Sequence, residues 1–255
     1  MKITRIQEDY LRILRFFRFS AEYGEEPYDK KGLKACTDYA SHLTQLSRER
    51  VTDEFLKILS LSSPLYALKT MDETGVLRQI LHPQQWAHIE ALIHLEKATK
   101  KSPSSLLRLA ALISNIEDIE IHLRLSKKQL RTVKFLRVNQ TPLTQNSFKQ
   151  QIYKLGKEMA FELIFFQLSH KIASKNISLT KGTSLFSTFQ KNYDAWEIPL
   201  FPLTGHDVLN SHIPQGEKVG TLLKMVQQWW LEKDLIPDKD ACLAYLNTLL
   251  SKKNL

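Results

Sequence analysis

Apolar residues recur at helical spacing along most of the chain. They repeat at the i, i+3, i+4 spacing of a half-buried helix in residues 4–23, 48–60, 126–138 and 217–233. The first segment carries an apolar stripe formed by Ile6, Tyr10, Ile13 and Phe17. Sustained alternation of apolar and polar residues, which would indicate strands, is absent. We therefore predict an all-α protein with no sheet, built from about a dozen helices.

Several predicted helices carry capping signals. The stretch "SKKQ" begins at Ser126, and Gln129 can complete a capping box with it. Ser47 can cap the next helix to its C-terminal side, with Glu49 in the first turn, where the helix dipole favours an acid. We expect breaks at "KKSPSS" (100–105) and "ISLTKGTS" (177–184), and a loop at "WEIPLFPL" (196–203).

The basic net charge of the chain indicates which kind of molecule it binds. The chain has 255 residues, of which 43% are hydrophobic, so it has enough apolar surface to form a core. Its formal net charge of +9 favours a polyanionic partner, and nucleic acid is the commonest. A generically basic surface is the alternative interpretation.

Cysteine usage and hydropathy bear on the compartment. Cys36 and Cys242 lie far apart and lack ligand-like spacing, so neither a disulfide framework nor a zinc site is expected. The first residues form no apolar signal-like run, and no stretch reaches the roughly 18 apolar residues that a membrane span needs. We expect a cytoplasmic protein with no membrane partner.

The segment "EDYLRILRFFRF" places charges of both signs on an apolar stripe. On a continuous helix, Glu8, Arg12 and Arg15 share one face, and Asp9 neighbours Arg12 at i, i+3. The simpler interpretation is a solvent-exposed helix face with an ordinary ion pair, which would stabilise the helix by a few tenths of a kcal/mol. The sharper interpretation is a hydrogen-bonding edge for a nucleobase, because a carboxylate accepts and a guanidinium donates.

This segment resembles the E-D-x-x-R-x-x-R motif of the class II tRNA nucleotidyltransferases, which comprise the CCA-adding enzymes and their bacterial poly(A) polymerase relatives. In that family the motif opens the neck domain, and its aspartate and arginine form a template that pairs with the base of CTP or ATP. The resemblance implies that Asp9 and Arg12 are the template pair and that Glu8 orients the arginine. It places Arg15 toward nucleotide phosphate or the head domain.

A second stretch, "LSRERVTDEFLKIL" (46–59), resembles the family's S-x-E-R-[IV]-x-x-E-[LF] segment, which closes the neck. The resemblance implies that Glu49, Arg50 and Glu54 brace the neck. A capped amphipathic helix is the simpler interpretation of the same residues and accounts for nearly all of them.

A third stretch, residues 201–230, resembles the family's tail pattern, P-[LIV]-x-G-x-D-[LV] followed by G-P-x-[VI]-G-x-x-L. The matching positions are Gly205, Asp207, Gly216, Val219 and Gly220. Glu217 stands where the family usually has proline. In relatives this region belongs to a helical body and tail that grips the upper arm of tRNA.

The family resemblance also implies a domain organisation. We expect an elongated array with a neck at 1–62, a helical body at 63–178 and a helical tail at 179–255. Within it, Lys127, Lys128, Arg131 and Lys134 lie on one predicted helix as candidate contacts to an RNA backbone. Tightly spaced lysines on a solvated face are the ordinary alternative.

The family transfers nucleotides on a head domain N-terminal to the neck, where a strand-borne D-x-D pair holds two magnesium ions. No such head is recognisable in this sequence. Its D-x-D pair, Asp238 and Asp240, follows a proline and is interpreted as a helix N-terminus. We therefore predict no catalytic residue and no cofactor for this chain, and expect Mg²⁺ with CTP or ATP only together with a head.

Histidines give no metal signal in the sequence. The eight histidines do not cluster, and the adjacent His206 and Asp207 lack the further ligands that an HD phosphohydrolase needs. We therefore predict no metal-ligating residues.

Two hypotheses of different class remain. In the first, the chain is the neck, body and tail of a CCA-adding or poly(A)-adding enzyme and binds tRNA or other RNA. Its catalytic head then lies on a separate polypeptide or has been lost. In the second, it is a head-less helical module that binds RNA or protein without a catalytic role. Either way the chain alone is predicted to be inactive as a nucleotidyltransferase.

Overall fold

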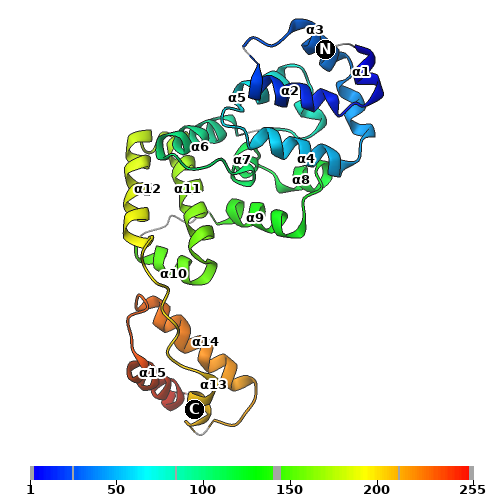
Figure 1. The fold of residues 1–255 in the computed structure, drawn as a ribbon. Coiled ribbons are helices and arrows are strands. Elements are labelled where there is room, and N and C mark those ends of the chain that lie inside the picture. The colour runs from blue at the N-terminus through cyan, green and yellow to red at the C-terminus, as the bar shows by residue number, and fades with distance from the viewer. Residues whose placement is uncertain (1–2, 25, 84, 140–144, 212, 253–255) are drawn as a thin grey trace. The chain divides into compact units, whose positions relative to one another are not determined.

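The computed structural model describes residues 3–24, 26–83, 85–139, 145–211 and 213–252. Within these ranges every regular element is a helix, which confirms the all-α prediction (Figure 1). The chain divides into two compact units, one of Met1–Thr141 with Glu162–Thr188 and the other of Pro142–Phe161 with Phe189–Leu255. The predicted boundaries after residues 62 and 178 follow a different, functional criterion and stay a prediction. None of the described helices is both long and apolar enough to cross a bilayer.

The first unit holds most of the helices. Its elements in chain order are α1 (Ile3–Glu8), α2 (Arg12–Tyr23), α3 (Lys30–Asp38), η1 (Ala40–Gln45), α4 (Arg48–Leu59), α5 (Leu65–Glu73), η2 (Leu77–Gln79), α6 (Trp86–Thr99), α7 (Ser105–Leu112), α8 (Ile116–His122) and α9 (Lys127–Val138). Two further helices, α11 (Lys157–Ala173) and α12 (Leu179–Tyr193), contribute residues to both units.

The second unit is smaller and contains one helix from the middle of the chain and the C-terminal helices. They are α10 (Gln145–Leu155), α13 (Gly205–Leu209), α14 (Glu217–Glu232) and α15 (Lys239–Lys252). Trp230 is buried at its centre together with Val226 and Leu246, and the Trp230 indole N–H donates to the backbone oxygen of Pro237 (2.9 Å). This bond satisfies the one polar atom of a large buried ring.

The prediction of one helix over residues 4–23 is wrong at residues 9–11, because α1 ends at Glu8 and α2 begins at Arg12. The Asp9 carboxylate accepts a hydrogen bond from the backbone N–H of Leu11 (3.1 Å). A short acidic side chain that bonds the backbone two residues further on competes with the helical ladder. The apolar stripe survives the break, since Ile6, Ile13 and Phe17 are all buried.

Most other local predictions are confirmed. Ser47 caps α4, Ser126 and Gln129 form the capping box of α9, and residues 196–203 form a loop. The predicted break at 177–184 is wrong from Leu179 onward, where α12 begins. Glycine suits position 182 inside this helix, because a Cβ there would collide with the side chain of Ile172.

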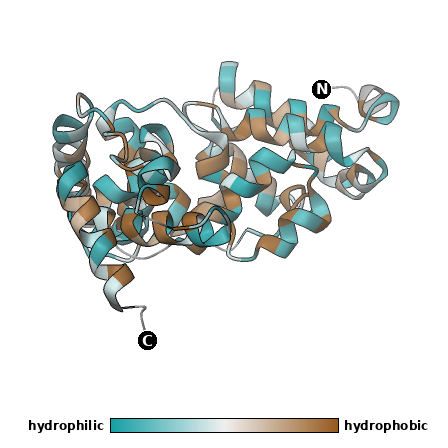
Figure 2. Ribbon diagram, turned by 90° about the horizontal axis from the view of Figure 1, so that it is seen from below, coloured by the Kyte–Doolittle hydropathy of each residue, from teal (hydrophilic) through white to brown (hydrophobic). Residues whose placement is uncertain are grey.

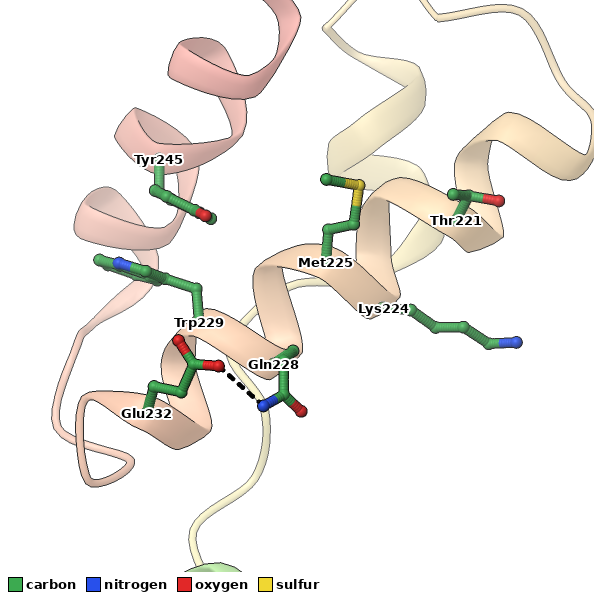
Figure 3. A pocket seen from close by; sticks show the side chains of 7 residues that line it. All are labelled: Thr221, Lys224, Met225, Gln228, Trp229, Glu232 and Tyr245. Carbon is green, nitrogen blue, oxygen red and sulfur yellow. Dashed lines mark hydrogen bonds between the residues drawn. The ribbon is translucent and has the colours of Figure 1, made fainter.

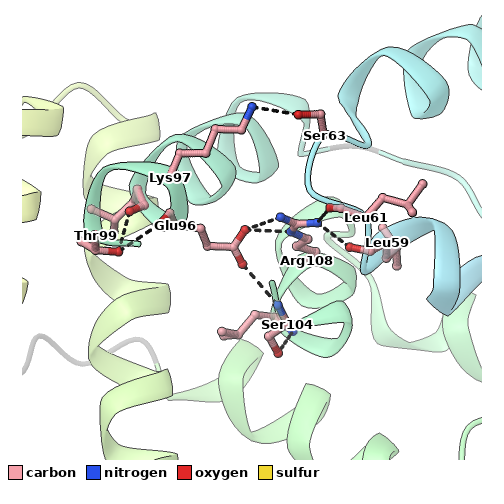
Figure 4. A network of polar contacts seen from close by, with 10 residues as sticks. Leu59, Leu61, Ser63, Glu96, Lys97, Thr99, Ser104 and Arg108 are labelled. Carbon is pink, nitrogen blue, oxygen red and sulfur yellow. Dashed lines mark hydrogen bonds and ion pairs between the residues drawn. The ribbon is translucent and has the colours of Figure 1, made fainter. Parts of the chain in front are cut away.

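Apolar helix faces turn toward neighbouring helices and polar faces turn outward (Figure 2). In the middle of this apolar packing lies a buried ion pair between Glu96 of α6 and Arg108 of α7 (Figure 4). Two Arg108 nitrogens donate to one Glu96 carboxylate oxygen, at 2.8 and 2.6 Å. A third donates to the backbone oxygens of Leu59 (2.6 Å) and Leu61 (2.5 Å). Arg108 therefore ties α6 and α7 to the C-terminal end of α4.

We expect Arg108→Met to lower the free energy of unfolding by about 3–5 kcal/mol, because it leaves Glu96 buried without its charge partner and two carbonyls without a donor. Arg124→Met is the matched control, since Arg124 is exposed and lies 3.7 Å from Glu49. It should cost under about 1 kcal/mol. Urea unfolding measures both, and equal losses would contradict the role of burial. The double variant with Glu96→Met should recover part of the loss.

His88 is a second buried polar group in this unit. Its Nε2 lies 3.0 Å from the Ser169 hydroxyl, while its Nδ1 has no hydrogen-bond partner in the described part of the chain. Burial, reinforced by the neighbouring His170, lowers the pKa of His88 from 6.5 to about 3. The ring is therefore neutral in the folded protein at physiological pH.

This pKa predicts a loss of stability in mild acid. The unfolded chain takes up the His88 proton below pH 6.5, whereas the folded protein takes it up only near pH 3. Stability should therefore fall by about 1.4 kcal/mol per pH unit below 6.5, or about 2 kcal/mol between pH 7 and pH 5. Urea unfolding of His88→Gln should lack this component. The exposed His94→Gln should retain it, and the same pH dependence in both variants would contradict the assignment.

Candidate functional site

The break between α1 and α2 places the Asp9 carboxylate next to α4. Both Asp9 oxygens accept from Nη2 of Arg50, at 3.0 and 2.9 Å. Asp9 and Arg50 are 41 positions apart, so this contact is made by the packing of α4 against the α1–α2 junction. Asp9 is thus held from two directions, by the Leu11 backbone and by Arg50.

The other predicted base-site residues lie around the same junction. Glu8 accepts from Nη1 of Arg12 at 2.5 Å, across the break between α1 and α2. Arg15 is exposed and has no ion-pair partner in the part of the chain that the structure describes. The structure thus brings Glu8 to Arg12 and Asp9 to Arg50, so each predicted template residue is held by a second charged side chain.

The predicted bracing residues of α4 differ in their contacts. Glu54 is buried and accepts from Nε of Arg18 on α2 at 2.5 Å. Glu49 is exposed and lies 3.7 Å from Arg124. Arg18 was not among the predicted site residues, although it stands in the opening segment. Its guanidinium also lies over the Phe19 ring, 4.1 Å from the centroid.

The predicted RNA-backbone residues share α9. Lys127, Lys128 and Arg131 are exposed. Lys134 is less exposed and bonds the Glu120 carboxylate at 2.7 Å. Three of the four cations are therefore directed to solvent, whereas the charge of Lys134 is compensated within the protein.

The tail-like motif serves local structure in the second unit. Asp207 accepts from the Thr204 backbone and hydroxyl, both at 2.7 Å, and pairs with Lys239 at 2.6 Å. The bond from Lys239, followed by those from Thr204, holds the pKa of Asp207 well below its usual range. Gly216, with φ of 154°, precedes α14 in a conformation that favours glycine.

The D-x-D pair behaves as predicted. Asp238 Oδ1 accepts from the backbone N–H of Ala241 (2.9 Å) at the start of α15. A carboxylate in this position caps the helix, and no strand lies beneath it in the described residues.

A hollow of about 420 Å³ lies on the second unit beside α14 and α15 (Figure 3). Its aromatic wall is a stack of Trp229 and Tyr245, with ring centroids 4.4 Å apart and planes 9° from parallel. Lys224 and Met225 also line the hollow and lie on α14, the helix of Trp229. Sequence reasoning missed this hollow because Tyr245 lies on a different helix from Trp229.

The prediction that the histidines do not cluster is wrong. His82, Asp118 and His122 form a group on the first unit, and the rings of His82 and His122 have centroids 5.5 Å apart. His88 and His170 form a second pair, at 5.1 Å. In both cases distant segments of the chain meet only after folding.

The sequence is similar to that of known proteins. Residues 29–89 match the family model described as "Probable RNA and SrmB- binding site of polymerase A". The mitochondrial CCA tRNA nucleotidyltransferase 1 of Mus musculus is 27% identical over 254 residues, covering 95% of this chain and 56% of that protein. The sequence of this chain is thus similar to that of CCA-adding tRNA nucleotidyltransferases.

Solved structures of CCA-adding enzymes share the fold. That of Bacillus stearothermophilus in complex with CTP gives a TM-score of 0.65 at 18% identity, covering 99% of this chain and 65% of that chain. That of Thermotoga maritima complexed with tRNA gives 0.59 at 15% identity, covering 98% and 63%. The similarity covers the C-terminal portion of those enzymes, and the chain spans about half the length of the mouse protein.

Proposed function

We propose that this chain is the RNA-binding and nucleotide-selecting part of a tRNA nucleotidyltransferase that adds CCA to tRNA 3′ ends. The observation that carries the proposal is the junction of α1 and α2, where Glu8 holds Arg12 and Arg50 holds Asp9. Transfer of the nucleotidyl group would take place on a head domain outside these residues.

The chemistry of the bases fits such a junction. Cytosine and adenine each present an exocyclic amino donor beside a ring acceptor, whereas uracil and guanine present the reverse pattern. A carboxylate accepts from the amino group, and a guanidinium donates to the ring nitrogen. Asp9 keeps about one acceptor site, because a carboxylate offers about four and Arg50 and Leu11 use three of them. Glu8 would fix the plane of the Arg12 guanidinium.

The exposed cations of α9 support binding of an RNA backbone. Lys127, Lys128 and Arg131 are directed to solvent on a chain of formal net charge +9. The stem of a tRNA is A-form and is recognised mainly through its shape and phosphates. Contacts of this kind position the RNA and carry little sequence information.

In this proposal, the head domain would bind magnesium together with the triphosphate of CTP or ATP. The D-x-D pair of this chain, Asp238 and Asp240, does not fit a two-metal site, because the Asp238 carboxylate caps the N-terminus of α15. The residues of this chain would orient the base and the RNA.

Two other functions share part of this support. The match of residues 29–89 to a polymerase A binding region favours a poly(A)-adding version of the same enzyme. A helical module that binds RNA or protein without a catalytic head would use the same basic surface.

The direct test is nucleotidyl transfer to tRNA lacking its 3′ end, with this chain alone and with a head domain of a CCA-adding relative. We expect transfer only in the presence of the head. Activity of the chain alone would contradict the proposed division of labour. No activity with any head, together with salt-sensitive tRNA binding, would favour the module without catalysis.

In the reconstituted enzyme, Asp9→Ala should reduce the preference for CTP and ATP over UTP and GTP by about 5- to 150-fold, the range for removing a two-bond interaction with a base. Asp9→Asn should have a similar effect while retaining an acceptor for the Leu11 N–H. Asp38→Ala removes an exposed carboxylate of α3 and serves as the control. Unchanged discrimination in both Asp9 variants would refute the template role.

The variant Lys127→Gln with Arg131→Gln should weaken tRNA binding by the chain alone. The slope of log K against log salt should fall by about 1 for each phosphate that the variant no longer neutralises. Lys97→Gln on α6 removes an exposed cation outside both α9 and the matched residues 29–89, and should leave the slope unchanged. Equal slopes for all three proteins would exclude α9 as the RNA surface.

A further inference from the structure

We propose that His82, Asp118 and His122 form a binding site for a divalent transition metal, with zinc as the first candidate. Each residue offers one ligand atom, and the three atoms all lie within 4.8 Å of one another. The site belongs to the first unit and involves neither the α1–α2 junction nor the cations of α9.

Local structure and packing bring the ligands together. Asp118 and His122 are one turn apart on α8, so their side chains share a face of that helix. His82 comes from the segment after η2, and its backbone N–H donates to Asp118 Oδ2 at 2.7 Å. This bond orients the carboxylate and leaves Oδ1 directed at both imidazoles. Such outer hydrogen bonds commonly fix metal ligands in place.

The distances suit a tetrahedral ion. His82 Nδ1 lies 3.0 Å and His122 Nε2 lies 3.5 Å from Asp118 Oδ1. Zinc bonds of about 2.0–2.1 Å in a tetrahedron require ligand atoms about 3.3–3.4 Å apart. The two imidazole nitrogens lie within 4.8 Å of each other and would approach by side-chain rotation. The side chains of His82 and His122 are 57% and 32% exposed, which leaves a fourth position open to water.

The donor set selects the class of metal. Two imidazoles and one carboxylate suit zinc and its neighbours, whereas magnesium prefers an all-oxygen shell. The described cysteines compete poorly, because Cys36 and Cys242 are both buried, and burial raises the pKa of the Cys36 thiol to about 12. This ion would therefore be distinct from the magnesium of nucleotidyl transfer.

The site would reinforce the packing of α8 against α4. Nη1 of Arg48, the first residue of α4, donates to the backbone oxygens of Glu120 (3.3 Å) and Ile121 (2.9 Å) near the C-terminal end of α8. A metal that joins α8 to the His82 segment would stiffen this contact. A solvated pair of His–Asp hydrogen bonds, without an ion, is the ordinary alternative.

The test uses the full chain, stripped of metal with a chelator and titrated with zinc chloride alone. We expect binding of one equivalent by calorimetry, a zinc-dependent rise in melting temperature, and a zinc X-ray absorption spectrum of nitrogen and oxygen ligands without sulfur. His122→Gln and Asp118→Asn should each weaken binding at least 10-fold. His94→Gln, which removes an exposed histidine of α6, should bind zinc like the unaltered chain.

Folding and binding are separated by melting each variant without zinc, where all should match the unaltered chain within a few degrees. Absence of one-equivalent binding by the unaltered chain would overturn the proposal. So would equal zinc affinity in the His122, Asp118 and His94 variants, or sulfur in the zinc shell. None of these outcomes depends on tRNA or nucleotide, so failure here leaves the proposed function intact.

Discussion

The buried ion pair of Arg108 and Glu96 is the interaction on which the geometry of the first unit depends. Arg108 uses its remaining donors on the backbone oxygens of Leu59 and Leu61. The last carbonyls of a helix have no partner within the helix, and in an apolar interior they need a donor from elsewhere. One side chain therefore neutralises a buried acid and positions the end of α4 against α6 and α7.

The position of α4 in turn sets the candidate base-binding edge. The same helix that Arg108 holds at its C-terminal end carries Arg50 and Glu54 nearer its start, and these residues pair with Asp9 and Arg18. Two ion pairs of opposite polarity therefore connect α4 to the α1–α2 region. The dense mixture of charges in the opening segment is thus divided between contacts to α4 and side chains such as Arg15 that face solvent.

Charged groups in this chain serve different chemistry according to their setting. Buried pairs position helices, since neither partner can be removed without leaving the other uncompensated. The exposed cations of α9 suit a flexible, salt-sensitive contact with a polyanion. The partly exposed imidazoles of His82 and His122 both lie next to the Asp118 carboxylate. Because these groups lie on different elements, substitutions can separate the proposed RNA binding, base selection and metal binding.

Sequence alone determined the features that depend on near neighbours in the chain. The helices at α4, α9 and α14 follow from apolar spacing, and the caps at Ser47, Ser126 and Asp238 bond residues a few positions away. The three motifs carry the resemblance to CCA-adding enzymes for the same reason, because a motif is a local pattern. Tertiary structure decided the rest. Arg50 reaches Asp9 across 41 positions and His82 reaches Asp118 across 36. Periodicity carries no information about such pairs, because they exist only once separate helices have packed against one another.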